Sequence, residues 1–132
     1  MPSCLIVEDH GDTRDGYAEY LSLCGFDVLT AADGVGFREV IDRVIPDVVV
    51  MDIQLPETDG WDLTAELRRN GRTRAVPVII VSARVQVADR ERSMQAGCDA
   101  FLGKPCDPHD LVDEINRLIK TAPHVATMPA DA

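Results

Sequence analysis

The sequence predicts a single α/β domain: a doubly wound sheet of five parallel strands in the order 2-1-3-4-5, with five helices. Five short apolar runs alternate along the 132 residues with segments whose apolar residues recur at helical spacing. That alternation is typical of β–α units, which build parallel sheets covered by helices on both faces. The second run alternates polar and apolar residues, so it is expected at an edge, while the first, third and fourth runs suit central positions.

Three strands and two helices are predicted in the first half of the chain. The strands are Cys4–Val7, Phe26–Ala31 and Val48–Met51. Apolar residues at helical spacing mark the first helix, namely Tyr17, Leu21 and Cys24. An i, i+3, i+4, i+7 stripe marks the second helix, which Pro46 closes, and this stripe consists of Phe37, Val40, Ile41 and Val44.

Two strands and three helices are predicted in the second half, with strands at Val78–Val81 and Ala100–Leu102. Asp59 is placed to cap the third helix, which ends at Asn70-Gly71, and residues 86–96 form the fourth. The fifth helix begins at Asp107-Pro108, because Asp caps well and Pro lacks the N–H that would stay unpaired there. Its apolar face consists of Leu111, Val112, Ile115, Leu118 and Ile119.

The sequence favours one cytoplasmic domain followed by a short tail. Residues 1–121 are expected to form the domain, and residues 122–132, with two prolines and little bulk, a flexible tail or truncated linker. The apolar runs are far shorter than the ~20 residues that a membrane helix needs, so no membrane insertion is expected. The start of the chain lacks the pattern of a secretory signal. Four cysteines without a CxxC pair favour free thiols in a reducing compartment.

The charge is unevenly distributed. A net charge of −10 argues against direct binding of nucleic acid, because phosphates repel an acidic surface. The stretch 68–92 is nevertheless basic, and it forms either a solvated surface or a docking surface for an acidic partner. Its basic residues are Arg68, Arg69, Arg72, Arg74, Arg84, Arg90 and Arg92.

Polar side chains stand where the predicted strands end. Glu8 and Asp9 follow the first strand, Asp52 the third, Ser82 the fourth and Lys104 the fifth. The carboxyl ends of parallel strands meet at one edge of the sheet, where ligands bind near the point at which the strand order reverses. We therefore expect these side chains to converge there.

Three gathered carboxylates require a cation. Two unit charges at 4 Å repel by about 1 kcal/mol in water and about 4 kcal/mol at an effective dielectric of 20. An all-oxygen ligand set suits Mg²⁺, which also tends to bind a phosphate oxygen. Lys104 can balance phosphate charge and the Ser82 hydroxyl can donate a hydrogen bond to it. The set predicts phosphoryl transfer to a carboxylate.

These motifs closely resemble those of the receiver domain of two-component response regulators. The matching stretches are VEDH, VVVMDIQLPETDG, VIIVSA and FLGKP, and the resemblance covers about residues 3–121. It implies a flavodoxin-like fold, in agreement with the topology predicted above. It further implies that the chain is a phosphoacceptor switch, able to promote its own phosphorylation and dephosphorylation, and not an enzyme acting on a separate substrate.

The resemblance also implies roles for individual residues. Asp52 would accept a phosphoryl group from a phosphohistidine on a sensor histidine kinase or a histidine phosphotransfer protein. Mg²⁺ would be held by Glu8, Asp9, Asp52 and the main-chain carbonyl of Gln54. Lys104 would pair with the phosphoryl oxygens.

The implied switch couples the new phosphate to a protein-binding face. Ser82 would move toward the phosphate and Phe101 would turn inward behind it. This shift would remodel the face formed by the fourth helix, fifth strand and fifth helix, which a downstream effector protein would bind. Such a change is a two-state element biased by added charge.

Four positions depart from the common pattern of that family. Gly36 replaces a helix-forming Glu, which should weaken the start of the second helix. Phe101 replaces the frequent Tyr and loses its hydroxyl. Gln54 and Arg84 occupy positions that tune phosphate loss, and Arg84 either reaches the phosphoryl group or blocks water.

Three other functions compete with this interpretation. A receiver can act as a docking module without phosphorylation. A Mg²⁺-dependent phosphatase of the haloacid dehalogenase type also uses an Asp after a strand, but it needs an acid where Gln54 stands. A flavodoxin-like cofactor domain is disfavoured, because no complete GxGxxG or GxxxxGK[ST] motif is present.

Overall fold

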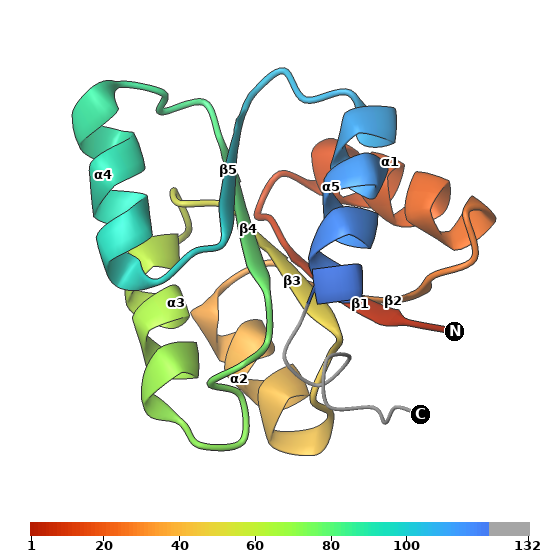
Figure 1. Ribbon diagram of the computed structural model, residues 1–132, viewed down its shortest axis with the longest axis horizontal. Helices are drawn as coiled ribbons and strands as arrows, with labels where there is room; N and C mark the ends of the chain where they lie inside the picture. Colours follow the sequence, from red (N-terminus) through yellow and green to blue (C-terminus); the bar gives the residue numbers. More distant parts are fainter. Residues whose placement is uncertain (122–132) are drawn as a thin grey trace.

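The structure of the chain, a computed structural model, describes residues 1–121 and confirms the predicted sheet (Figure 1). Five parallel strands lie in the order β2-β1-β3-β4-β5. The strands are β1 (Ser3–Val7), β2 (Asp27–Ala31), β3 (Val48–Met51), β4 (Val78–Ser82) and β5 (Ala100–Gly103). The helices are α1 (Gly11–Leu23), α2 (Gly34–Arg43), α3 (Gly60–Arg69), α4 (Val87–Ala96) and α5 (Pro108–Thr121). The expected tail, 122–132, lies outside the described residues.

The sheet separates two apolar cores. Helices α1 and α5 cover one face, and α2, α3 and α4 cover the other (Figure 1). Successive side chains of a strand point to opposite faces, so Leu5 of β1 packs on the α2–α3–α4 side and Ile6 on the α1–α5 side. Both are fully buried. This two-sided burial explains why the central strands have continuous apolar sequences.

The edge strands differ from the central ones, as predicted. β2 is exposed at Asp27 and Thr30, and all four residues of β5 are half-buried. Three strands are one residue longer than predicted, since β1 begins at Ser3, β4 ends at Ser82 and β5 ends at Gly103. β2 begins one residue later than predicted, at Asp27. Within residues 1–121, no helix combines the length and apolar character needed to cross a membrane.

The helix starts follow the predicted capping residues. Asp59 accepts the backbone N–H of Asp62 at 2.9 Å, and Asp107 accepts that of His109 at 2.8 Å. Asp33 caps α2 by accepting the N–H of Gly36 at 2.8 Å. The helix therefore forms despite its glycine.

Two residues of the predicted helical patterns lie outside the helices. Cys24 and Val44 follow the last residues of α1 and α2, and both are exposed. At Cys24 the helix has already ended, and Gly25, with φ of 96°, turns the chain toward β2. At Val44 the backbone is extended, with φ of −141°. Helical spacing alone does not reveal where a helix stops.

Candidate functional site

Two carboxylates emerge side by side at the carboxyl edge of the sheet. Val7 of β1 pairs with Met51 of β3, so the next residues, Glu8 and Asp52, leave adjacent strands at the same level. With Asp9 they offer carboxylate oxygens that all lie within 4.8 Å of one another. The convergence predicted from the strand ends is therefore confirmed for these three acids.

Lys104 joins this group from the end of β5. Its Nζ donates to Glu8 Oε1 at 2.7 Å and to Asp52 Oδ2 at 3.1 Å. Glu8 is 4% exposed and Asp52 7%, so both charges are nearly withdrawn from water. Burial alone would lower the pKa of Lys104, but the hydrogen bonds and charges of Glu8 and Asp52 outweigh burial and raise it.

Lys104 balances only part of the negative charge. Three carboxylates and one ammonium carry a formal charge of −3 + 1 = −2. Asp9 is exposed, so one side of the group faces solvent. A divalent cation would neutralise the remainder, and a ligand set made only of oxygens fits Mg²⁺ better than Zn²⁺.

The loop between β3 and α3 packs tightly on Asp52. A Cβ placed on Gly60 would lie 2.0 Å from the Asp52 carbonyl oxygen, so no other residue fits at this position. The Gly60 N–H donates to the carbonyl of Ile53 at 2.8 Å. The N–H of Gln54 donates to Asp52 Oδ1 at 3.3 Å, which fixes residue 54 beside the carboxylate.

Ser82 lies beside this group, but its hydroxyl is not bonded to it. The N–H of Lys104 donates to the main-chain carbonyl of Ser82 at 2.9 Å. The Ser82 hydroxyl is fully buried and accepts the N–H of Arg84 at 3.0 Å. Phe101 is half-buried on β5, with the guanidinium of Arg90 at 4.8 Å from its ring centre.

The structure adds contacts that the sequence did not reveal. Arg84 pairs with Asp89 Oδ1 at 3.1 Å and lies 5.0 Å from the ring centre of Trp61, so its side chain is held at α4. His10, in the loop after β1, accepts the N–H of Thr13 and caps α1. His is not among the residues that usually cap helices, so the sequence did not indicate this role.

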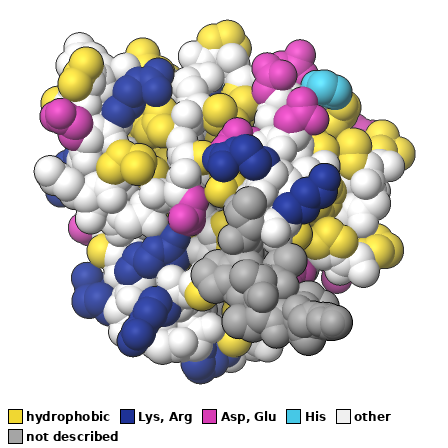
Figure 2. Space-filling view, in the orientation of Figure 1, with side chains coloured by type: hydrophobic (Ala, Val, Ile, Leu, Met, Phe, Trp, Pro, Cys, Tyr) yellow, Lys and Arg dark blue, Asp and Glu magenta, His cyan; other side chains and the backbone are white. Residues whose placement is uncertain are grey.

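Most of the basic stretch has structural partners. Arg68 donates to the carbonyls of Gly97, Arg74 and Val76 and pairs with Asp99. Arg84 and Arg90 have the contacts given above. In addition, Arg72 donates to the Ile41 carbonyl and Arg92 stacks on Trp61. Basic side chains still gather over α3 and the loop toward β4 (Figure 2). Of these five arginines, Arg68 is half-buried and the other four are exposed, in agreement with a solvated surface, although the sequence did not reveal their contacts.

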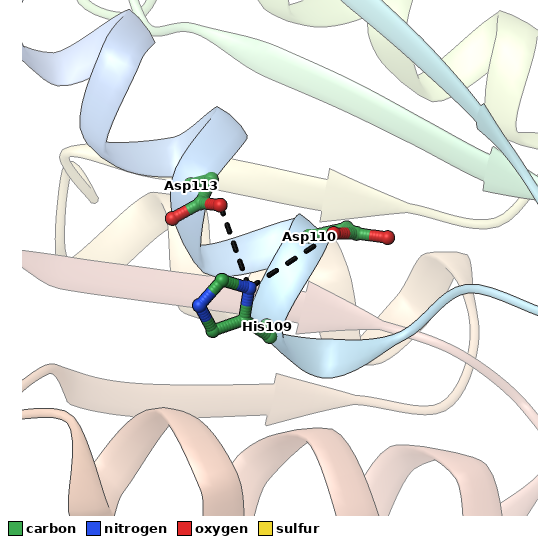
Figure 3. A group of neighbouring side chains, drawn as sticks. All are labelled: His109, Asp110 and Asp113. Carbon is green, nitrogen blue, oxygen red and sulfur yellow. Dashed lines mark ion pairs between the residues drawn. The ribbon is translucent and has the colours of Figure 1, made fainter.

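A second group of possible metal ligands lies in the first two turns of α5 (Figure 3). His109 Nδ1 is 3.5 Å from Asp113 Oδ2 and 3.9 Å from Asp110 Oδ1. All three side chains are at least 66% exposed, so water already solvates these charges. Unlike Glu8 and Asp52, they need no cation to offset burial.

A cavity of about 720 Å³ opens beside Lys104, between α1 and the segment after β5. Its walls include the aromatic side chains of Tyr17 and Tyr20, with Pro105 opposite. Two residues that line it are bonded to each other, since the Tyr17 hydroxyl donates to the Cys106 carbonyl at 3.4 Å. The acidic group therefore adjoins a largely apolar concave surface.

Comparison with known proteins gives a consistent result. The family model for the response regulator receiver domain matches residues 4–116. The DNA-binding dual master transcriptional regulator RpaA of Synechocystis is 31% identical over 120 residues, which are 91% of this chain and 50% of that protein. The chain thus spans about half the length of this curated relative.

Two solved structures support the same fold. The receiver domain of a sensor histidine kinase from Pseudomonas aeruginosa PAO1, with a magnesium ion coordinated in its active-site cleft, is 32% identical with a TM-score of 0.82. The alignment covers 89% of this chain and 97% of that one. A CheY-like receiver domain protein from Methanospirillum hungatei has a TM-score of 0.86 at 25% identity, covering 92% and 95%.

Proposed function

Because the chain belongs to the response regulator receiver family, and is thus a two-component phosphoacceptor switch, we propose that Asp52 is the residue that accepts the phosphoryl group. The observation that carries this proposal is the position of Asp52 between a lysine and two further carboxylates. Asp52 is bonded to Lys104 at one oxygen and to the Gln54 N–H at the other. Its orientation is therefore fixed before any phosphodonor arrives.

In the proposed reaction, an Asp52 carboxylate oxygen attacks the phosphorus of a phosphohistidine on the donor protein. The new P–O bond forms as the P–N bond breaks, and the imidazole nitrogen keeps the electron pair of that bond. Lys104 can then pair with the transferred oxygens, because it already lies within 3.1 Å of Asp52. The products are the aspartyl phosphate and a neutral histidine once that nitrogen takes up a proton.

Glu8, Asp9, Asp52 and the carbonyl of Gln54 would hold Mg²⁺. The ion supplies charge compensation for the approaching phosphate, which the −2 charge of the group would otherwise repel. The magnesium-bound relative from Pseudomonas supports this assignment, because its ion lies in its active-site cleft.

The receiver family implies a histidine kinase as a partner, and we assign the donor to the cavity beside Lys104. The apolar walls between α1 and the segment after β5 would bury a helical donor surface next to Asp52. A sensor kinase and a histidine phosphotransfer protein fit equally well. The expectations that residues 1–121 form the functional unit, act in the cytoplasm and bind no nucleic acid remain predictions.

The output of the switch would be the face formed by α4, β5 and α5. Ser82 would rotate toward the aspartyl phosphate, and Phe101 would follow it. Phe101 is only half-buried, and its ring is covered by Arg90 from α4, so its movement would also shift α4. A downstream effector protein would recognise the changed face.

Labelling with acetyl phosphate tests the acceptor. Intact-mass measurement should show one added phosphoryl group on the wild type with Mg²⁺ and none with a chelator. Asp52→Asn should abolish the label. Asp59→Asn is the matched control, because Asn also caps helices and Asp59 is bonded to the backbone of α3 and not to Lys104.

The alternatives give different results in this experiment. Labelling that survives Asp52→Asn would refute the assignment. Effector binding without any labelling would favour the phosphorylation-independent docking module. Repeated turnover of a phosphate monoester would favour the phosphatase.

A further inference from the structure

Arg84 connects the end of β4 to two helices. Its main-chain N–H donates to the Ser82 hydroxyl at 3.0 Å. Its guanidinium lies 3.1 Å from Asp89 in the first turn of α4 and 5.0 Å from the ring centre of Trp61 in the first turn of α3. A single residue therefore holds the Ser82 hydroxyl with its backbone and both helices with its side chain.

Asp89, the partner of Arg84 on α4, is itself held in place. Asp89 is 8% exposed, and its second oxygen accepts the N–H of Gln86 at 3.2 Å within a capping box. A nearly buried carboxylate requires a charged partner, and Arg84 provides it. Moving Arg84 would leave this carboxylate without its cation unless α4 moved as well.

Trp61, the partner of Arg84 on α3, is also held in place. Trp61 is 7% exposed, and its indole N–H donates to the Ser93 hydroxyl of α4 at 2.9 Å. Gly60, the preceding residue, packs against the carbonyl of Asp52. The aromatic ring that Arg84 covers is thus tied both to α4 and to the loop that carries the phosphoacceptor.

We propose that Arg84 is a positioning residue: its side chain, held by Asp89 and Trp61, keeps its own main-chain N–H on the Ser82 hydroxyl and so opposes rotation of that hydroxyl toward a phosphoryl group on Asp52. This inference rests on the proposed function. Ser82 moves between staggered rotamers, and a new rotamer carries its oxygen away from the Arg84 N–H. The N–H then loses its acceptor, so the phosphoryl group must offset that loss.

Arg92 provides a matched control. Its guanidinium stacks on the same Trp61 ring, at 4.5 Å from the centre. Its backbone lies in α4, eight residues beyond the N–H that holds Ser82, and Asp89 pairs with Arg84 and not with Arg92. Removing Arg92 therefore weakens the stacking on Trp61 without releasing Ser82.

Beryllofluoride, a phosphoryl analogue, tests the proposal in the presence of saturating Mg²⁺. Trp61 is the only tryptophan of the chain, so its fluorescence reports binding, and calorimetry gives an independent midpoint. Arg84→Ala should lower the half-saturating concentration about fivefold or more, the lower range of typical couplings between sites. Asp89→Asn, which keeps the acceptor for the Gln86 N–H, should lower the half-saturating concentration by a smaller factor. Arg84→Lys should give a half-saturating concentration between those of Arg84→Ala and the wild type.

Arg92→Ala should change the Trp61 emission but leave the midpoint at the wild-type value. An unchanged or raised midpoint for Arg84→Ala, or an equal drop for Arg92→Ala, would overturn the role of Arg84. If Arg84→Ala does not fold, Asp89→Asn decides the question in the same way. Failure of the wild type to bind beryllofluoride, or undiminished binding by Asp52→Asn, would instead refute the proposed function.

Discussion

Both edges of the sheet carry aspartates, but only one edge gathers uncompensated charge. At the amino edge, Asp47 accepts the N–H of Ser3 at 2.7 Å, and Asp99 accepts the N–H of Val78 at 2.8 Å. Asp99 also pairs with Arg68 at 2.8 Å. Each of these carboxylates is satisfied by groups that the fold itself supplies.

At the carboxyl edge the backbone offers fewer donors, because strands end there in carbonyl groups. Glu8 and Asp52 each accept one main-chain N–H and then share Lys104. Asp9 has no such compensation among the contacts of residues 1–121. The contrast teaches that an acidic residue after a strand is a ligand candidate, whereas one before a strand tends to complete the hydrogen bonding of its neighbours.

The largest expected effect comes from removing the shared cation. Lys104→Met should lower the free energy of unfolding by about 2 to 3 kcal/mol, because two buried carboxylates lose their partner. Mg²⁺ should restore more stability to this variant than it adds to the wild type. Urea unfolding with and without Mg²⁺ measures both quantities. If Mg²⁺ stabilised wild type and Lys104→Met equally, the claim that only the carboxyl edge gathers uncompensated charge would be wrong.

A smaller loss is expected at the amino edge. Asp99→Ala should cost about 1 to 2 kcal/mol, since the Val78 N–H loses its acceptor and Arg68 its ion pair. Asp99→Asn is the control, because its amide oxygen can still accept the Val78 N–H, and it should cost less. Neither variant should change the response to Mg²⁺ in the same urea experiment. A Mg²⁺ effect at Asp99 would contradict a purely structural role.

The smallest expected effect is an alkaline one. The pKa of Lys104 is raised by its carboxylate partners, so its stabilisation is complete below the ordinary lysine value of about 10.4 and is lost as pH rises through the higher folded value. The stability difference between wild type and Lys104→Met should therefore shrink at high pH. Cys4, whose pKa burial raises to about 12, ionises in both proteins and cancels. A difference that grows above pH 10.5 would contradict this sign.

The sheet and the acidic group could be predicted because both depend on local patterns. Apolar runs located the strands, and Asp52 followed one of them directly. The roles of Arg84 and Arg68 could not be predicted, because their partners lie in other elements and arginine has the same sequence signal whether it is solvated or bonded. Cys24 was assigned to the first helix although that helix ends at Leu23, because the spacing of apolar residues does not show where a helix ends.

The central sheet also isolates its two faces from each other. Side chains that pack beneath α1 and α5 share no core with those beneath α2 and α3. Residues on one face can therefore be exchanged in an engineered chain without repacking the opposite one. A designer could repack the core beneath α2 and α3 and leave untouched the core beneath α1, beside which the phosphodonor is proposed to dock.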